Sequence, residues 1–173
     1  MERRHVADGP IPGRRDLRLR RHRRAGGCRR LAGVSDPHDL ARFVEAQDPV
    51  YEQVTAALRR GRKTGHWMWF VLPQLRGLGQ SAMAHRYGIG SAAEARAYWA
   101  HPLLGPRLKD CVELVLAVEG KTATAIMGSP DDVKLRSCLT LFERVAPEEP
   151  AFARALEKYY RGERDPLTLA MLR

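Results

Sequence analysis

The sequence predicts an all-α fold: a compact, single-domain bundle of about seven or eight helices that follows a disordered N-terminal extension. Pairs of Asp or Ser with Pro recur directly before apolar stretches, as they do at helix starts. Glycines fall where the same stretches should stop. No alternating pattern typical of a strand extends beyond the run Trp67–Leu72.

The helix starts follow one rule. An Asp or Ser at the N-cap accepts backbone N–H groups, and Pro follows at the first helical position, where its missing donor is no loss. The pairs are Asp36–Pro37, Asp48–Pro49, Ser129–Pro130 and Asp165–Pro166, and Ser91 with Glu94 adds a capping box. The expected helices cover residues 37–47, 49–60, 80–87, 91–99, 102–118, 130–146, 150–161 and 166–172, with Gly61, Gly120 and Gly162 as stop signals.

The helix expected over residues 102–118 is apolar around most of its circumference. Its main stripe consists of Leu104, Leu108, Cys111, Val112, Val115 and Val118. Burying each such Leu or Val fully contributes roughly 1.5–3 kcal/mol. We therefore place this helix in the middle of the bundle and assign it no chemistry.

The helix expected over residues 130–146 mixes two roles. Asp131 and Lys134 project inside its apolar stripe, which runs from Leu135 to Val145. Charged residues three apart in a first turn can form a local ion pair, and the helix geometry favours this interpretation. The alternative is a cation beside helix N-terminal amides that awaits an anionic ligand.

The run from Lys63 to Gly79 (KTGHWMWFVLPQLRGLG) is the most unusual part of the chain. Between Gly61 and Pro73 a period of two fits better than a helical period, although six apolar residues suit a short strand or a buried helical turn. The Gly-Leu-Gly sequence after Arg76 then predicts a loop, with Gly77 or Gly79 at positive φ.

The same run supplies groups that suit a planar anionic ligand. Lys63 is a possible anion partner, and His66 can donate or accept a proton near neutral pH. Trp67 and Trp69 offer faces for stacking, and Gln74 offers a planar amide. Each Trp taken alone is more typical of a side chain in the hydrophobic core. Together with Lys63 and His66, a ligand-binding pocket and a packed core are equally good interpretations of the segment.

The net charge of +10 belongs to the N-terminal part of the chain. Residues 1–35 hold 11 Arg and three acids, while residues 36–173 hold 19 basic and 17 acidic side chains. We expect residues 1–34 to be a disordered, Arg-rich extension and residues 35–173 to form the domain. If Val34 is the true start, the residues before it are untranslated. Nucleic-acid binding by the folded domain is not favoured, although the extension could bind nucleic acid through its arginines.

Other classes of protein fit the sequence less well. The histidines lack metal-ligand spacing, so we expect no metal site, and no cofactor motif is present. Three widely spaced cysteines form no disulfide framework and are typical of the cytoplasm. The longest apolar run has six residues, which is too short for a membrane-spanning helix. No feature of the sequence indicates a particular protein partner.

Several longer motifs resemble the bacterial family catalogued as domain of unknown function 1810. These are DPHDLARFVEAQ from Asp36, GRKTGHWMWFVLPQLRGLGQS from Gly61, YGI from Tyr87, EARAYWAHPLLGPRL from Glu94, GSPDDVKLRSCLTLF from Gly128 and DPLTL from Asp165. Members are sometimes labelled calpastatin, but an inhibitor that folds on its target would be disordered and poor in aromatic residues. The resemblance implies a compact, helical, cytoplasmic domain and no particular activity.

The resemblance also implies which residues are important. The family's signature falls on Lys63, His66, Trp67, Trp69, Gln74, Tyr87, Asp131, Lys134 and Ser137. Our leading hypothesis is a site for a small planar anionic ligand, nucleotide-like or phosphorylated. His66 would bind or transfer a proton there, and the other eight residues would bind the ligand. The alternative is a non-catalytic helical scaffold or protein-interaction module. The sequence leaves open whether the protein is an enzyme.

Overall fold

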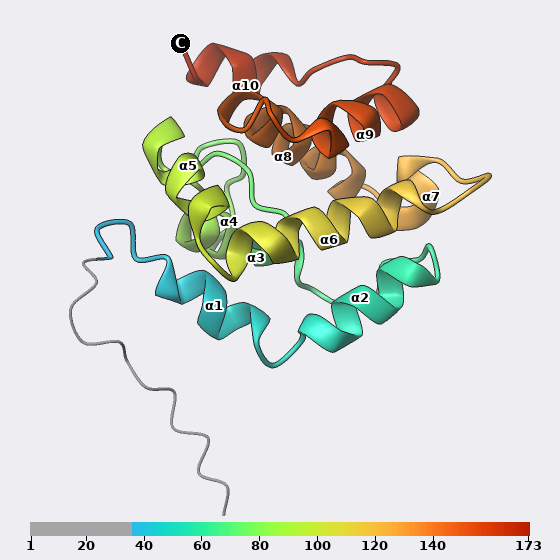
Figure 1. Ribbon diagram of the computed structural model, residues 1–173, viewed down its shortest axis with the longest axis horizontal. Helices are drawn as coiled ribbons and strands as arrows, with labels where there is room; N and C mark the ends of the chain where they lie inside the picture. Colours follow the sequence, from blue (N-terminus) through green and yellow to red (C-terminus); the bar gives the residue numbers. More distant parts are fainter. Residues whose placement is uncertain (1–35) are drawn as a thin grey trace, which may run out of the picture. The chain divides into compact units, whose positions relative to one another are not determined.

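The computed structural model describes residues 36–173, and all regular secondary structure in that range is helical (Figure 1). The predicted all-α fold is thus confirmed. The expectations for residues 1–34, disorder and a possible start at Val34, lie outside the described residues. The helices are α1 Ala41–Gln47, α2 Tyr51–Arg59, α3 Met68–Val71, α4 Ala82–Tyr87, α5 Ala92–Ala100, α6 Leu104–Leu116, α7 Ala123–Met127, α8 Asp131–Val145, α9 Pro150–Tyr160 and α10 Pro166–Met171.

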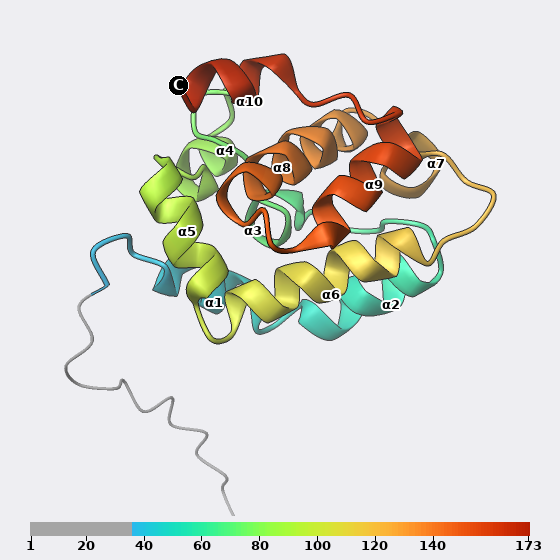
Figure 2. The same ribbon diagram turned by 45° about the horizontal axis from the view of Figure 1, so that its top comes forward.

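Helices α6 and α8 form the centre of the domain. Helix α6 contacts α2, α3, α5 and α9, while α8 contacts α5, α7, α9 and α10. Figure 2 shows α2 running alongside α6, with α8 and α9 on the other side of α6. The predicted stripe of α6 is buried from Leu104 to Val115, and only Val118, beyond the helix end, is half-buried. The central position predicted for this helix is confirmed.

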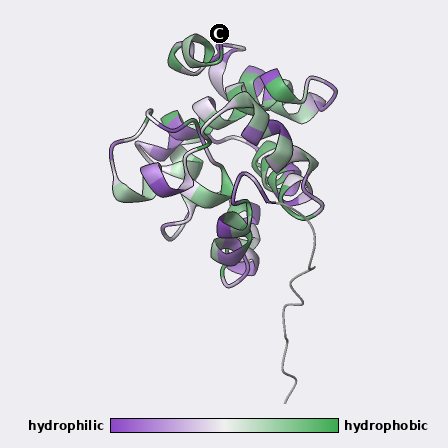
Figure 3. Cartoon of the chain, turned by 90° about the vertical axis from the view of Figure 1, so that its left-hand side faces the viewer, coloured by the Kyte–Doolittle hydropathy of each residue, from purple (hydrophilic) through white to green (hydrophobic). Residues whose placement is uncertain are grey.

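The apolar faces of the helices meet in one core. Figure 3 shows hydrophilic and hydrophobic segments alternating along the same helices, as expected of amphipathic elements. Tyr98 is fully buried, with its ring centroid 5.0 Å from that of Phe43 and 5.5 Å from that of Phe142. The side-chain amide of Gln47, also buried, donates to Phe70 O (2.7 Å) and Tyr98 Oη (3.0 Å), so α1, α3 and α5 are joined by hydrogen bonds as well as by packing.

The proline rule holds at one helix start and is wrong in detail at the others. Asp165 caps α10 as predicted, accepting from Thr168 N at 2.9 Å. Asp36 accepts from Leu40 N and Ala41 N, yet the helix begins only at Ala41, after a turn. Asp48 ends α1 rather than starting α2 and pairs with Arg107 at 2.9 Å. Pro130, not Ser129, occupies the N-cap of α8 and makes no side-chain cap.

Two features in the middle of the chain complete the sequence prediction. Of the strand and the buried helical turn that the sequence left open, residues 68–71 form the turn, the short helix α3, and the segment has no strand partner within the described residues. Helix α7 was not predicted, although Thr122 caps it by accepting from Ala125 N at 3.1 Å. Gly77 has the predicted positive φ, at 103°.

The turn from α5 into α6 depends on a close approach of backbone to backbone. A Cβ atom placed on Gly105 would lie 2.0 Å from the carbonyl oxygen of Trp99. Any other residue at position 105 would therefore force the two helices apart at this corner.

Candidate functional site

The loop between α2 and α3 carries Lys63 to the start of α8. Gly61 ends α2 with φ 61°, and Lys63 N then donates to Ile126 O at 2.6 Å. Because Ile126 lies in α7, just before α8 begins, this backbone contact fixes the Lys63 side chain beside the first turn of α8.

Two lysine ammonium groups from distant parts of the chain meet at one carboxylate there. Lys63 Nζ lies 2.8 Å from Asp131 Oδ2, and Lys134 Nζ lies 2.7 Å from Asp131 Oδ1. The i, i+3 pair predicted for α8 is therefore present, and Lys63 extends it. Two cations share one anion, which leaves the group with one excess positive charge.

Each ammonium group also lies over an indole ring. Lys63 Nζ is 4.9 Å from the ring centroid of Trp67, and Lys134 Nζ is 5.2 Å from that of Trp69. Both distances suit cation–π contacts. We call these five residues the lysine–indole cluster: Lys63, Trp67, Trp69, Asp131 and Lys134.

The members of the lysine–indole cluster differ in how open they are. The side chain of Lys63 is only 7% exposed and also donates to Gly65 O at 2.7 Å, whereas that of Lys134 is 23% exposed. Trp67 is buried and donates through Nε1 to Thr64 O, while Trp69 is half-buried. Lys134 and Trp69 are therefore the accessible edge of the cluster.

The Asp131 carboxylate is held in its charged form. Burial raises the pKa of Asp131. The hydrogen bonds from Lys134 and Lys63, together with the positive charges of these lysines, lower it by more, so the pKa is lowered overall. A ligand anion that binds the lysines would thus compete with an ionised internal carboxylate.

The remaining predicted site residues have other surroundings. His66 is exposed in the loop between Lys63 and α3, and Gln74 is half-buried, with its carbonyl accepting from Ile89 N. Tyr87 is buried against the rings of Phe43 and Phe70. Ser137 is buried and donates to Asp165 Oδ2 at 3.2 Å. The structure gathers Lys63, both indoles, Asp131 and Lys134, but places Tyr87 and Ser137 in the interior.

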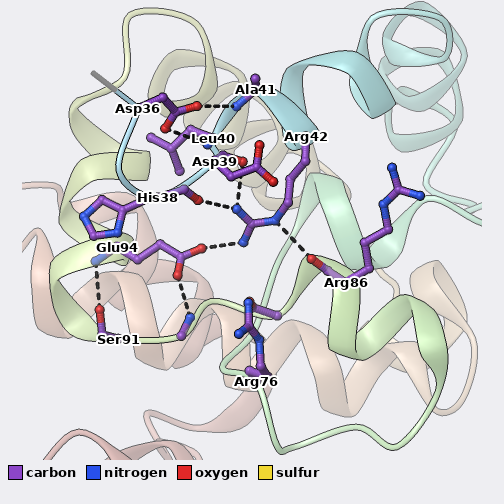
Figure 4. A network of polar contacts seen from close by, with 12 residues as sticks. Asp36, His38, Asp39, Leu40, Ala41, Arg42, Arg76, Arg86, Ser91 and Glu94 are labelled. Atoms are coloured by element: carbon purple, nitrogen blue, oxygen red, sulfur yellow. Dashed lines mark hydrogen bonds and ion pairs between the residues drawn. The ribbon is translucent and has the colours of Figure 1, made fainter. Parts of the chain in front are cut away.

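A second polar group, unforeseen in the sequence, surrounds the guanidinium of Arg42 (Figure 4). Arg42 Nη2 pairs with Glu94 Oε1 at 2.5 Å, and both side chains are less than one-tenth exposed. Arg42 also donates to the backbone oxygens of His38, Asp39 and Arg86. Ser91 Oγ accepts from Glu94 N, as in the predicted capping box. The Glu94 carboxylate, however, accepts from Gly90 N at 2.8 Å and not from Ser91 N. This network ties α1 to α4 and α5 and occupies four of the five N–H donors of Arg42.

Neither buried cysteine has the properties of a nucleophile. Burial raises the pKa of Cys111 to about 12 and that of Cys138 well above its usual range. Both thiols therefore remain protonated and pack as small apolar side chains.

Two hollows of the surface lie away from the lysine–indole cluster. One of about 590 Å3 lies between α2 and α6 and is lined by Tyr51, Thr55 and Asp110, among others. Another of about 270 Å3 lies beside α10. None of the helices in residues 36–173 is long and apolar enough to cross a bilayer.

Comparison with known proteins identifies relatives of the whole domain. No curated protein matches the chain. A crystal structure of the conserved hypothetical protein Rv1873 from Mycobacterium tuberculosis is 56% identical in sequence, with a TM-score of 0.78 over 79% of this chain and 98% of that one. The model of the family described as "Protein of unknown function (DUF1810)" matches residues 37–172. Because that match covers nearly all of the described residues, the chain belongs to the DUF1810 family, as its motifs predicted.

Proposed function

We propose that the lysine–indole cluster binds a small planar anionic ligand, nucleotide-like or phosphorylated. One observation supports this most directly: two ammonium groups, each on the face of an indole, converge on a single carboxylate and carry one excess positive charge. A group with unbalanced charge and flat apolar faces matches a ligand that has an anionic end and a planar body.

The accessible edge of the cluster defines how the ligand would bind. Lys134 contacts Asp131 and the Trp69 ring, so one of its three N–H donors remains for an anion. Trp69, the less buried indole, is the ring against which a planar group would stack. Gln74 supplies an amide in the loop after α3, and His66, exposed in the loop before it, supplies the group that binds or exchanges a proton.

The state of Lys63 supports a second candidate, a helical scaffold in which the cluster is only structural. Its ammonium group contacts Asp131, Gly65 O and the Trp67 ring, which occupy its donors without any ligand. In this alternative the cluster fastens the loop between α2 and α3 to α8, and the domain serves as a platform for other proteins.

Ligand binding separates the two candidates. We expect ADP or AMP, added to the purified full-length chain, to raise its melting temperature, and Lys134→Met to weaken the binding measured by calorimetry at least about tenfold. Lys109→Met is the matched control, since Lys109 pairs with Glu149 at 2.8 Å much as Lys134 pairs with Asp131.

The opposite results would support the scaffold. If nucleotides, pyrophosphate and phosphorylated sugars all leave the wild-type melting temperature unchanged, the ligand proposal is wrong. Binding that is equally strong in the wild type and in Lys134→Met would show that any ligand site lies elsewhere.

A further inference from the structure

The hollow beside α10 has apolar walls and a cationic side. It measures about 270 Å3, and its apolar lining includes Leu75, Ile89, Met171 and Leu172. Arg76, Arg173 and Ser91 line it as well. No acidic side chain is among the residues that line it.

The motifs PQLRGLG and YGIG build this hollow by pairing with each other. Leu75 and Ile89 form a parallel bridge, in which Arg76 N donates to Ile89 O (2.8 Å) and Ile89 N donates to Gln74 O (2.9 Å). A Cβ on Gly88 would lie 2.7 Å from Arg76 Cα, so glycine is needed for the two segments to approach. The backbone that carries Arg76 is thus held in place.

The guanidinium of Arg76 forms no ion pair within the described residues, and the nearby Glu94 carboxylate pairs with Arg42 instead. Arg76 donates to Gly88 O at 3.2 Å, and within residues 36–173 no carboxylate lies within ion-pair distance of it. Arg42, in contrast, pairs with Glu94 and donates to three backbone oxygens (Figure 4). Since a guanidinium has five N–H donors, Arg76 retains enough to hold an anion through two parallel hydrogen bonds.

We propose that this hollow binds a small organic carboxylate with a short, branched apolar body. The carboxylate would bind Arg76, and the body would lie against Met171, Leu172 and Ala92, because Leu75 and Ile89 are already buried by the protein itself. A volume of about 270 Å3 corresponds to about nine water molecules at about 30 Å3 each, which suits a ligand of roughly that many non-hydrogen atoms. This site shares no residue with the lysine–indole cluster and does not depend on it.

Titration with 4-methylpentanoate, followed by the backbone amide signals of the full-length protein, tests this proposal. We expect saturable shifts at Gly90, Ser91 and Leu172. The uncharged amide of the same acid should bind at least about tenfold more weakly, because it cannot form the charged pair with Arg76. Inorganic phosphate should bind more weakly than the carboxylate, since it leaves the apolar walls uncovered.

Variants separate the cationic from the apolar contribution. Arg76→Met should weaken binding at least about tenfold, whereas Arg86→Met is the matched control, since Arg86 does not line the hollow and its guanidinium lies over the Tyr87 ring. Ala92→Leu, which fills the hollow but keeps Arg76, should also abolish the shifts. Absence of saturable shifts in the wild type, tighter binding of phosphate, or unchanged binding in a folded Arg76→Met protein would each overturn the proposal.

Discussion

At the scale of single residues, His101 closes the start of α6 where no Asp or Ser is available. Its Nδ1 accepts from Leu103 N at 3.2 Å and from Leu104 N at 3.3 Å. An acceptor at Nδ1 requires that this nitrogen carry no proton. Burial lowers the pKa of His101, although the nearby Asp36 carboxylate opposes that effect. The sequence offered no sign of this role, since a lone histidine before a proline matches no capping motif.

This cap predicts a pH-dependent stability. The pKa in the folded state lies below the ordinary value of 6.5, so the unfolded chain binds the proton more readily. The stability that the cap contributes is complete above pH 6.5 and is lost as the pH falls below it toward the lowered pKa. We expect the urea midpoint to fall over this range, with losing the cap costing about 1 kcal/mol. His101→Asn, which can accept through Oδ1 without titrating, should flatten the dependence, and a slope equal to the wild type would contradict this role.

At the scale of elements, α10 is attached to α8 by one buried carboxylate. Asp165 Oδ2 accepts from Thr168 N, Thr168 Oγ1 and Ser137 Oγ, while Asp165 N donates to Thr140 Oγ1. Leu167, on α10, is exposed, so these polar contacts carry much of the attachment.

Removing that carboxylate should release the last helix. We expect Asp165→Ala to lower the free energy of unfolding by about 1–3 kcal/mol, because it leaves the hydroxyl of Thr168 without its acceptor and removes the cap, while Ser137 retains only Val133 O. Hydrogen exchange should show the amides of α10 losing protection before those of α6. Asp110→Ala, at an exposed acid, is the control. Equal protection of α10 in the variant would show that packing alone holds it.

The elements also show what a sequence pattern can predict. Apolar periodicity located α6 and α8 because each buries one long stripe in the core, and the local cap at Asp165 needs only nearby residues. Helix α3 and helix α7 are short, so their type depends on the elements that surround them rather than on their own pattern.

The candidate site shows the same division between local and distant information. The i, i+3 pair of Asp131 with Lys134 followed from spacing alone. The contact of Lys63 with Asp131, and the burial of Tyr87 and Ser137, depend on how distant segments pack, and no single pattern contained them. The Arg42–Glu94 pair was missed for the same reason, since charged residues on short helices usually face solvent.

At the scale of the whole molecule, carboxylates with lowered pKa values stabilise separate parts of the domain. A hydrogen bond from Lys109 in α6 lowers the pKa of Glu149 at the start of α9. Burial raises the pKa of Asp36, but hydrogen bonds from the backbone of residues 38–41 lower it overall. Asp131 behaves in the same way and connects α8 to the loop after α2.

These groups predict a loss of stability in acid. Because their pKa values in the folded domain lie below the ordinary values of 3.8 for Asp and 4.5 for Glu, protons bind preferentially to the unfolded chain. The stability they contribute is complete above about pH 4.5 and is lost as the pH falls through their lowered pKa values. Urea unfolding at a series of pH values should show this fall. Asp131→Asn should lower stability at pH 7 by about 1–3 kcal/mol and reduce the acid slope. An unchanged slope would mean that other groups govern it.

The corner at Gly105 constrains which sequences can adopt this domain. Its hydrogen stands where a methyl group would meet the Trp99 carbonyl oxygen at 2.0 Å. Among homologues that retain the crossing of α5 and α6, position 105 should admit a single amino acid, whatever ligand each protein binds. A homologue with a larger residue there must have a wider junction, so this position indicates a change of backbone geometry before any coordinates are known.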